Sequence, residues 1–148
     1  HFALKLRIPG WSTTTHAALN GQPLPAVAGQ YLELTREWRN GDRIVLDLDM
    51  ALHTWVGERE QLGQVSLYRG PLLLAWDRRF NSTAPDAIPP LDLTALEPQR
   101  LAWQGPDPAP WLLLSLSSAD GLPLVLCDFA TAGMAGTPYL SWLPYQPN

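Results

Sequence analysis

The sequence predicts an all-β fold, an antiparallel β-sandwich with Greek-key or jelly-roll connections. In residues 2–8, apolar side chains alternate with Ala3, Lys5 and Arg7, which is the two-residue period of a half-buried strand. Residues 65–68 and 72–76 predict two more strands, joined across Arg69-Gly70-Pro71. The sequence shows no sustained helical period of 3.6, so we expect roughly nine to eleven short strands closing into a sandwich.

Turn residues separate the other expected strands. Asn20-Gly21 is a strong hairpin signal, because both residues accept a positive φ. Pro23 confines the strand after this turn to a sheet edge. Residues 72–76 are apolar on both faces, which favours a central position. The remaining strands are expected at residues 17–19, 31–35, 43–48, 52–56, 111–117, 122–129 and 139–143.

The length of 148 residues is that of one domain, and we expect a single β-sandwich over residues 1–148. Residues 77–110 hold seven prolines that interrupt any long helix, so a long Pro-rich connection is predicted there. The chain enters its first strand at Phe2. We therefore expect an upstream domain that is absent from this chain.

The charge balance limits the partners. A net charge of −4 argues against nucleic acid and against an anionic membrane, which both attract clustered Lys and Arg. No apolar run reaches the length of a membrane-spanning helix. Only 16% of the residues are charged, so we expect part of the surface to be covered by another domain or subunit.

An ordered series of five segments resembles the C-terminal β-sandwich region of glycoside hydrolase family 127, the β-L-arabinofuranosidase-like proteins. The resemblance covers residues 2–76 well and the rest of the chain less well. The segments are Arg7-Ile8-Pro9-Gly10-Trp11, Leu19-Asn20-Gly21-Gln22-Pro23, Glu37-Trp38 with Gly41-Asp42, Val45-Leu46-Asp47-Leu48-Asp49-Met50, and Val65-Ser66-Leu67-Tyr68-Arg69-Gly70-Pro71-Leu72.

The resemblance implies a missing N-terminal catalytic domain, an α/α barrel with a zinc-bound cysteine nucleophile and an acidic partner. None of those motifs is present in this sequence. A zinc site needs several converging Cys, His or carboxylate ligands, and this chain has one cysteine and three histidines. We therefore predict no catalytic residues, no metal site and no cofactor in this chain.

Residues with chemical potential mostly favour structural interpretations. Cys127 lies in an apolar strand, where a free cysteine behaves as a small hydrophobic residue. Asp47 and Asp49 share one face of a strand, roughly 6.5–7 Å apart. Apolar residues 44, 46 and 48 fill the opposite face, so we expect the two aspartates on the solvated face, with a calcium site as the alternative. His16 and His53 have no Cys or His at ligand spacing, so we expect them at the surface.

The aromatic residues and one arginine suggest recognition surfaces. The Arg69-Gly70-Pro71 segment favours a structural turn. The alternative is a docking surface for the catalytic domain, formed by the planar charged group of Arg69 with Tyr68, Gly70, Pro71 and Trp11. Trp38, Trp55 and Trp103 are candidates for stacking on sugars, against the alternative of packing. Trp76, Trp111 and Trp142 lie beside apolar strand residues and are expected in the core.

Two functional hypotheses follow. The first is a non-catalytic accessory β-sandwich of a glycoside hydrolase, which braces the catalytic barrel and mediates homodimerisation. The second is a carbohydrate-binding module that recognises plant polysaccharide through exposed aromatic side chains. The expected partners are the missing catalytic domain of the same polypeptide, a second copy of the chain, or carbohydrate.

Overall fold

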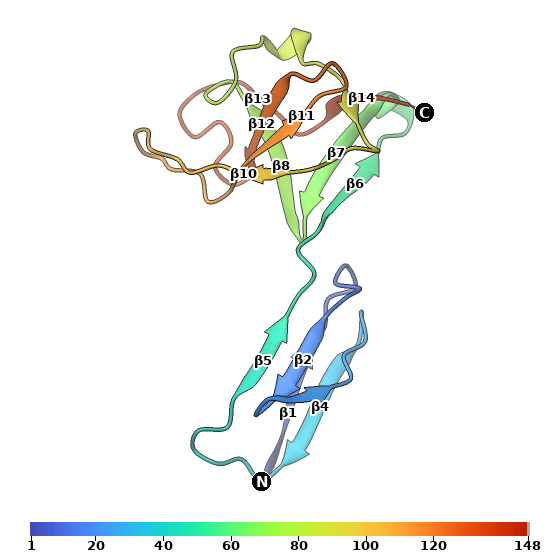
Figure 1. The fold of residues 1–148 in the computed structure, drawn as a ribbon, viewed down its shortest axis with the longest axis vertical. Coiled ribbons are helices and arrows are strands. Elements are labelled where there is room, and N and C mark those ends of the chain that lie inside the picture. The colour runs from blue at the N-terminus through green and yellow to red at the C-terminus, as the bar shows by residue number, and fades with distance from the viewer. Residues whose placement is uncertain (148) are drawn as a thin grey trace. The chain divides into compact units, whose positions relative to one another are not determined.

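A computed structural model describes residues 1–147, and the contacts within the chain divide it into two units (Figure 1). The N-terminal unit is His1–Ala51 and the C-terminal unit is Leu52–Asn148. The division into two units does not test the expected single β-sandwich domain over residues 1–148, which stays a prediction. The described residues form 14 strands and two short 3-10 helices, which confirms the all-β, sandwich-like fold. None of the described helices has the length and apolarity to span a membrane.

The N-terminal unit contains two antiparallel sheets. Strands β1 (Phe2–Arg7) and β4 (Tyr31–Arg36) pair along their full length. A salt bridge of 3.0 Å joins Lys5 to Glu33 across this pair. The second sheet has the order β3-β2-β5, formed by Gln22–Leu24, His16–Leu19 and Ile44–Asp47. Strand β3 carries Pro23 and lies at the edge, as predicted.

The core of the N-terminal unit is small. Ile8, Ala17 and Leu32 are its buried members, and Ile8 is completely inaccessible to solvent. Half-buried apolar residues from β1, β3, β4, β5 and the loop after β3 surround them, namely Leu6, Leu24, Ala26, Leu34 and Leu46. Most of the stabilisation of this unit by apolar burial therefore depends on a few side chains.

A polar link joins two turns of the N-terminal unit. Asn20, at φ +52°, donates from Nδ2 to Asp42 at 2.7 Å and accepts from the Arg43 amide at 2.8 Å. Asp42 also accepts from the Arg39 amide at 2.9 Å. These hydrogen bonds, and the positive charge of nearby arginines, lower the pKa of Asp42. Side-chain hydrogen bonds thus join the Asn20-Gly21 turn to the turn at Asn40-Gly41-Asp42.

The C-terminal unit is built on one nine-stranded sheet. Its main path has the order β10-β11-β12-β8-β7-β14-β9, with β13 beside β8 and β6 beside β7. Only the β14–β9 pair is parallel among the described strands. The strands are β6 Leu52–Val56, β7 Gln64–Arg69, β8 Leu72–Asp77, β9 Leu91–Asp92, β10 Gln99–Arg100, β11 Leu113–Ser117, β12 Pro123–Asp128, β13 Tyr139–Leu140 and β14 Leu143–Gln146.

Strand β8 is central and pairs with β7, β12 and β13, as its two apolar faces predict. The pairing of β7 with β14 and of β8 with β12 joins strands far apart in the sequence, so the sheet is no simple meander. Twelve buried apolar residues, with Trp76 the largest, form the core of this unit.

The Pro-rich connection after β8 is more than a linker. It contains the 3-10 helix η2 (Pro85–Ala87) and the short strands β9 and β10. Ile88 and Leu91 are buried and belong to the core of the C-terminal unit. The prolines prevent a long helix, while the apolar residues between them pack against the sheet.

Candidate docking and carbohydrate-binding surfaces

The predicted docking turn joins β7 to β8 in a two-residue hairpin. Gly70 has φ +53°, which glycine adopts without steric cost, and the buried Gly70 is followed by the exposed Pro71. Tyr68 is half-buried and its ring stacks on His53, with centroids 5.2 Å apart and 12° between the planes. Arg69 is half-buried as the last residue of β7. The turn is therefore rigid, and Pro71 projects from its tip.

Trp11 belongs to a different unit from this hairpin. It follows the buried Ile8 and the turn at Pro9-Gly10, and its side chain is half-buried. The next residue, Ser12, is fully buried, and its hydroxyl accepts from the Asp49 amide at 2.7 Å. The buried hydrogen bond of Ser12 thus holds the backbone next to Trp11, while part of the Trp11 side chain stays accessible to solvent.

Two candidate sugar-stacking residues differ in how strongly they are packed. Trp38 donates from Nε1 to the Phe2 carbonyl at 3.0 Å. Its indole also contacts the ring of Phe2 and the guanidinium of Arg36. Trp55, on β6, is 67% exposed. A free aromatic face is needed for stacking on a sugar, so Trp55 meets this condition better than Trp38.

The side chain of Trp103 packs against the loop that follows it, residues 105–106. Its Nε1 donates to the Pro106 carbonyl at 3.1 Å, and Phe80 approaches edge-on with a centroid distance of 5.1 Å. A Cβ on Gly105 would lie 2.1 Å from the indole, so the ring rests directly on that glycine. The guanidinium of Arg79 lies 5.7 Å from the ring centroid. These contacts favour the packing interpretation for Trp103.

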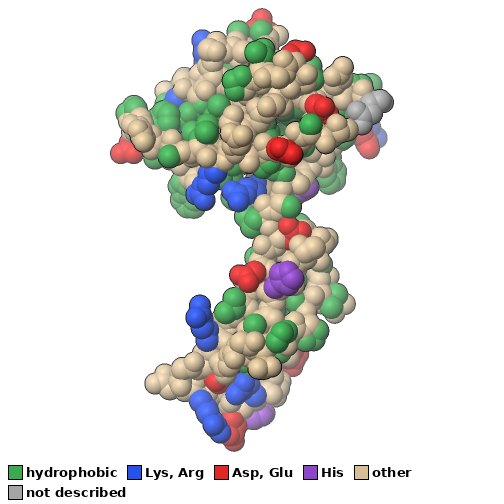
Figure 2. Space-filling view, viewed as in Figure 1, with side chains coloured by type: hydrophobic (Ala, Val, Ile, Leu, Met, Phe, Trp, Pro, Cys, Tyr) green, Lys and Arg blue, Asp and Glu red, His purple; other side chains and the backbone are tan. Residues whose placement is uncertain are grey.

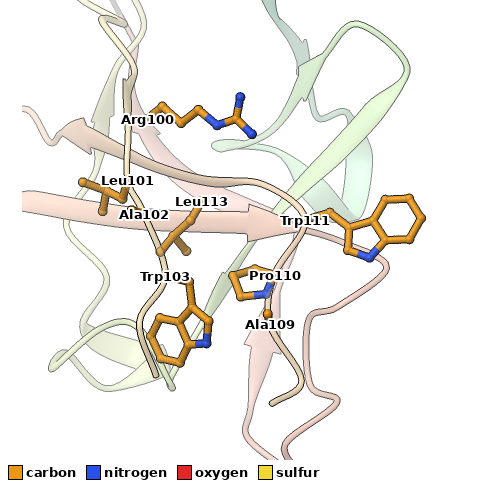
Figure 3. Close-up of a pocket in the computed structure, with 8 residues that line it drawn as sticks. All are labelled: Arg100, Leu101, Ala102, Trp103, Ala109, Pro110, Trp111 and Leu113. Carbon is orange, nitrogen blue, oxygen red and sulfur yellow. The ribbon is translucent and has the colours of Figure 1, made fainter. Parts of the chain in front are cut away.

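Trp103 also lines an open pocket of about 500 Å³ (Figure 3). Arg100 is the only charged side chain of the lining, and the remaining residues are Leu101, Ala102, Trp103, Ala109, Pro110, Trp111 and Leu113. Figure 3 shows the indoles of Trp103 and Trp111 pointing in different directions. The pocket therefore lacks a continuous aromatic platform.

The expectation that Trp111 belongs to the core is wrong. Its side chain is 84% exposed, because β11 begins at Leu113 and not at residue 111. The backbone amide of Trp111 is instead bound by Asp128 at 2.8 Å, which holds the residue outside the sheet. Trp76 is completely buried, as expected, and Trp142 is half-buried. Figure 2 shows other hydrophobic side chains at the surface of each unit.

Two buried carboxylates that sequence reasoning did not single out organise the loops of the C-terminal unit. Asp77, at the end of β8, accepts from the Arg79 amide, the Gly133 amide and the Thr137 hydroxyl at 2.6–2.9 Å. Asp128, at the end of β12, accepts from the amides of Trp111 and Leu112 and from Thr131. Each carboxylate ends a strand and combines a partner two or three residues away with partners 16 to 60 residues away. The distant partners give no local signal in the sequence.

Cys127 is completely buried on β12, directly before Asp128, and it pairs with Ala75 on β8. Burial raises the pKa of the Cys127 thiol to about 12, and the charges of Asp77 and Asp128 contribute to the increase. The thiolate is the reactive form, so this thiol is inert at neutral pH. The expected role as a small core residue agrees with this placement.

We expect Cys127 in the folded chain to resist thiol reagents. Because the protonated, buried thiol is a poor nucleophile, modification by iodoacetamide at neutral pH should require unfolding. Mass spectrometry after incubation with and without urea measures this directly. Rapid modification without denaturant would contradict the burial of the thiol.

The other titratable candidates are dispersed. Asp47 is exposed on β5, with His16 as its cross-strand partner, while Asp49 is half-buried and accepts from the Ala51 amide at 3.0 Å. Glu58 and Glu60 are exposed around the 3-10 helix η1 (Arg59–Gln61). Within residues 1–147, no group of three or more His, Cys, Asp and Glu side chains is placed to hold a metal ion.

Comparison with protein families gives one match. Residues 1–50 match the family model "Beta-L-arabinofuranosidase, GH127 middle domain". The match ends beside Ala51, the last residue of the N-terminal unit. The matched model describes a middle domain, so a C-terminal position in a parent polypeptide stays a prediction. No curated protein matches the chain.

Three solved structures align with 98–99% of the chain. A structure described as "Glycoside hydrolase" has a TM-score of 0.77 and 25% identity, over 99% of this chain and 28% of its own. A GH127 beta-arabinofuranosidase has a TM-score of 0.71 and 20% identity, over 98% and 28%. A GH127 beta-L-arabinofuranosidase from Geobacillus stearothermophilus T6 has a TM-score of 0.65 and 18% identity, over 98% and 26%. The chain thus spans about a quarter of these proteins, and the last two similarities show the fold alone.

Proposed function

We propose that this chain is a non-catalytic accessory β-sandwich region of a glycoside hydrolase, with the role of bracing the catalytic barrel of the same polypeptide. The observation that carries the proposal is the pair of coverages: the solved glycoside hydrolase aligns with 99% of this chain, which is 28% of that protein. The match of residues 1–50 to the model of a GH127 middle domain supports the same role. The parent reaction is then hydrolysis of a glycosidic bond, with L-arabinofuranosides as the substrate class.

The surfaces proposed for bracing are the hairpin at Tyr68-Arg69-Gly70-Pro71 and Trp11. The pairing of Arg69 with Leu72, the restricted φ of Pro71 and the stacking of Tyr68 on His53 hold the hairpin in one conformation. A rigid surface loses little conformational entropy when it docks, which favours stable packing between domains. We also propose that the chain forms a homodimer through exposed apolar side chains.

Replacing Arg69 by alanine in the full-length parent is expected to lower its melting temperature by a few degrees. The variant loses the planar charged group at the docking turn while the Gly70-Pro71 backbone is kept. Differential scanning calorimetry of the parent provides the measurement, with Arg100→Ala as a matched control from an exposed strand. Unchanged melting and activity in Arg69→Ala would count against docking through this turn.

A carbohydrate-binding module is the second candidate function. It is favoured by the exposure of Trp55 and Trp111, at 67% and 84%. Exposed indoles can stack on the apolar faces of sugars. Binding of the isolated chain to a glycan array separates this function from bracing, because bracing needs no sugar affinity.

A further inference from the structure

A second pocket, of about 720 Å³, lies in the C-terminal unit and contains none of the residues that the sequence singled out for function. Four stretches of the sequence meet there: η1 with the start of β7, η2 with Ile88, the residue after β12, and β13 with the start of β14. The side chains that matter for the argument are Gln61, Gln64, Asp86, Phe129, Tyr139 and Trp142.

The apolar wall of this pocket is a fixed aromatic surface. Phe129 and Tyr139 are 43% and 46% exposed and meet edge to face, with centroids 5.8 Å apart. A Cβ on Gly133 would lie 2.5 Å from the Tyr139 ring, so the ring rests on the glycine backbone. Gly133 has φ +72°, and its backbone amide donates a hydrogen bond to the Asp77 carboxylate. Tyr139 therefore presents an aromatic surface that needs little ordering on binding.

The polar side of the pocket is neutral apart from one carboxylate. Gln61 and Gln64 are half-buried at the end of η1 and the start of β7, and each amide can both donate and accept hydrogen bonds. Asp86, on η2, is the only charged residue of the lining. The lining contains no Lys, Arg or His, so it has no group that would favour an anion.

We propose that this pocket binds a neutral sugar residue. A sugar ring has an apolar C–H face that fits the aromatic wall, and hydroxyls that match the glutamine amides and Asp86. The pocket around Trp103 lacks this combination, because Arg100 is its only strongly polar side chain. The inference gives the second candidate function, carbohydrate binding, a defined site apart from Trp55 and Trp111, and it is independent of the bracing role.

The test is an NMR titration of the 148-residue chain with three probes: methyl β-L-arabinofuranoside, D-galactose and D-glucuronate. At least one neutral probe is expected to cause saturable shifts in the side-chain amides of Gln61 and Gln64 and in the backbone amide of Tyr139. Glucuronate at the same concentration is expected to bind more weakly, because it brings a negative charge beside Asp86. No saturable shift with either neutral probe, or equal affinity for glucuronate, would overturn the proposal.

Substitutions assign the binding to the pocket. Tyr139→Ala is expected to weaken binding by at least about tenfold, and Gln64→Ala by about fivefold. Tyr139→Phe keeps the aromatic face and should stay within about twofold of the original affinity. Tyr31→Ala, which removes a 61% exposed tyrosine from the N-terminal unit, is the matched control. Dispersed amide spectra establish that each variant is folded, and unchanged affinity in both Tyr139→Ala and Gln64→Ala would overturn the assignment.

Discussion

Replacing Asp128 by alanine is expected to lower the free energy of unfolding of the C-terminal unit by about 3–4 kcal/mol. The carboxylate accepts from the amides of Trp111 and Leu112 at 2.8 and 3.1 Å, and from the Thr131 hydroxyl at 2.9 Å. Asp128 is only 4% exposed, so water cannot readily replace it as an acceptor. Alanine therefore leaves buried donors without a partner, and each costs about 1–3 kcal/mol.

Thermal unfolding followed by near-ultraviolet circular dichroism measures this loss, which corresponds to a decrease in melting temperature of at least about 10 °C. Asp120→Ala is the matched control, because Asp120 is an exposed aspartate in the turn before β12. That variant should change stability by no more than about 0.5 kcal/mol. Equal melting temperatures for Asp128→Ala and the original chain would show that the carboxylate does not organise the loops.

Replacing Ile8 by alanine is expected to unfold the N-terminal unit. Ile8 is fully buried in a core that has only two other buried residues, Ala17 and Leu32. Truncating such a side chain costs about 2–5 kcal/mol. A unit of this size has a total stability of about 3–8 kcal/mol, so the loss is comparable with the whole.

Amide NMR spectra resolve the effect, since signals of residues 1–51 should collapse into the narrow range of an unfolded chain. Val27→Ala is the matched control, because Val27 is a β-branched residue of the same unit that is 54% exposed. Its spectrum should stay dispersed. A dispersed spectrum for Ile8→Ala would mean that the stability of this unit does not depend on the small core around Ile8.

The strands with a clear period of two were predictable from the sequence. The expected strand at residues 31–35 is β4, Tyr31–Arg36, and the strand at 43–48 is β5, Ile44–Asp47. Pro23 and the apolar run at 72–76 predicted an edge strand and a central strand, and both positions are confirmed. Period, proline and hydrophobicity are local properties, so they can be interpreted without knowledge of the fold.

Features that depend on distant contacts were not predictable. The start of β11 lies at Leu113 because Asp128 holds the amides of residues 111 and 112 outside the sheet, and this shift leaves Trp111 exposed. The aromatic pocket at Tyr139 requires η1, η2 and the ends of β12 and β13 to meet. No residue spacing in the sequence indicates that these elements come together. The resemblance of residues 2–76 to glycoside hydrolase family 127 indicated the kind of protein but not this pocket.

Bracing of a catalytic domain is tested most directly by the melting temperature of the parent polypeptide with and without the region equivalent to residues 1–148. We expect the catalytic domain without this region to melt at a clearly lower temperature, because the apolar surface covered by the β-sandwich becomes exposed to water. A catalytic domain that melts at the same temperature in both forms would contradict the bracing function.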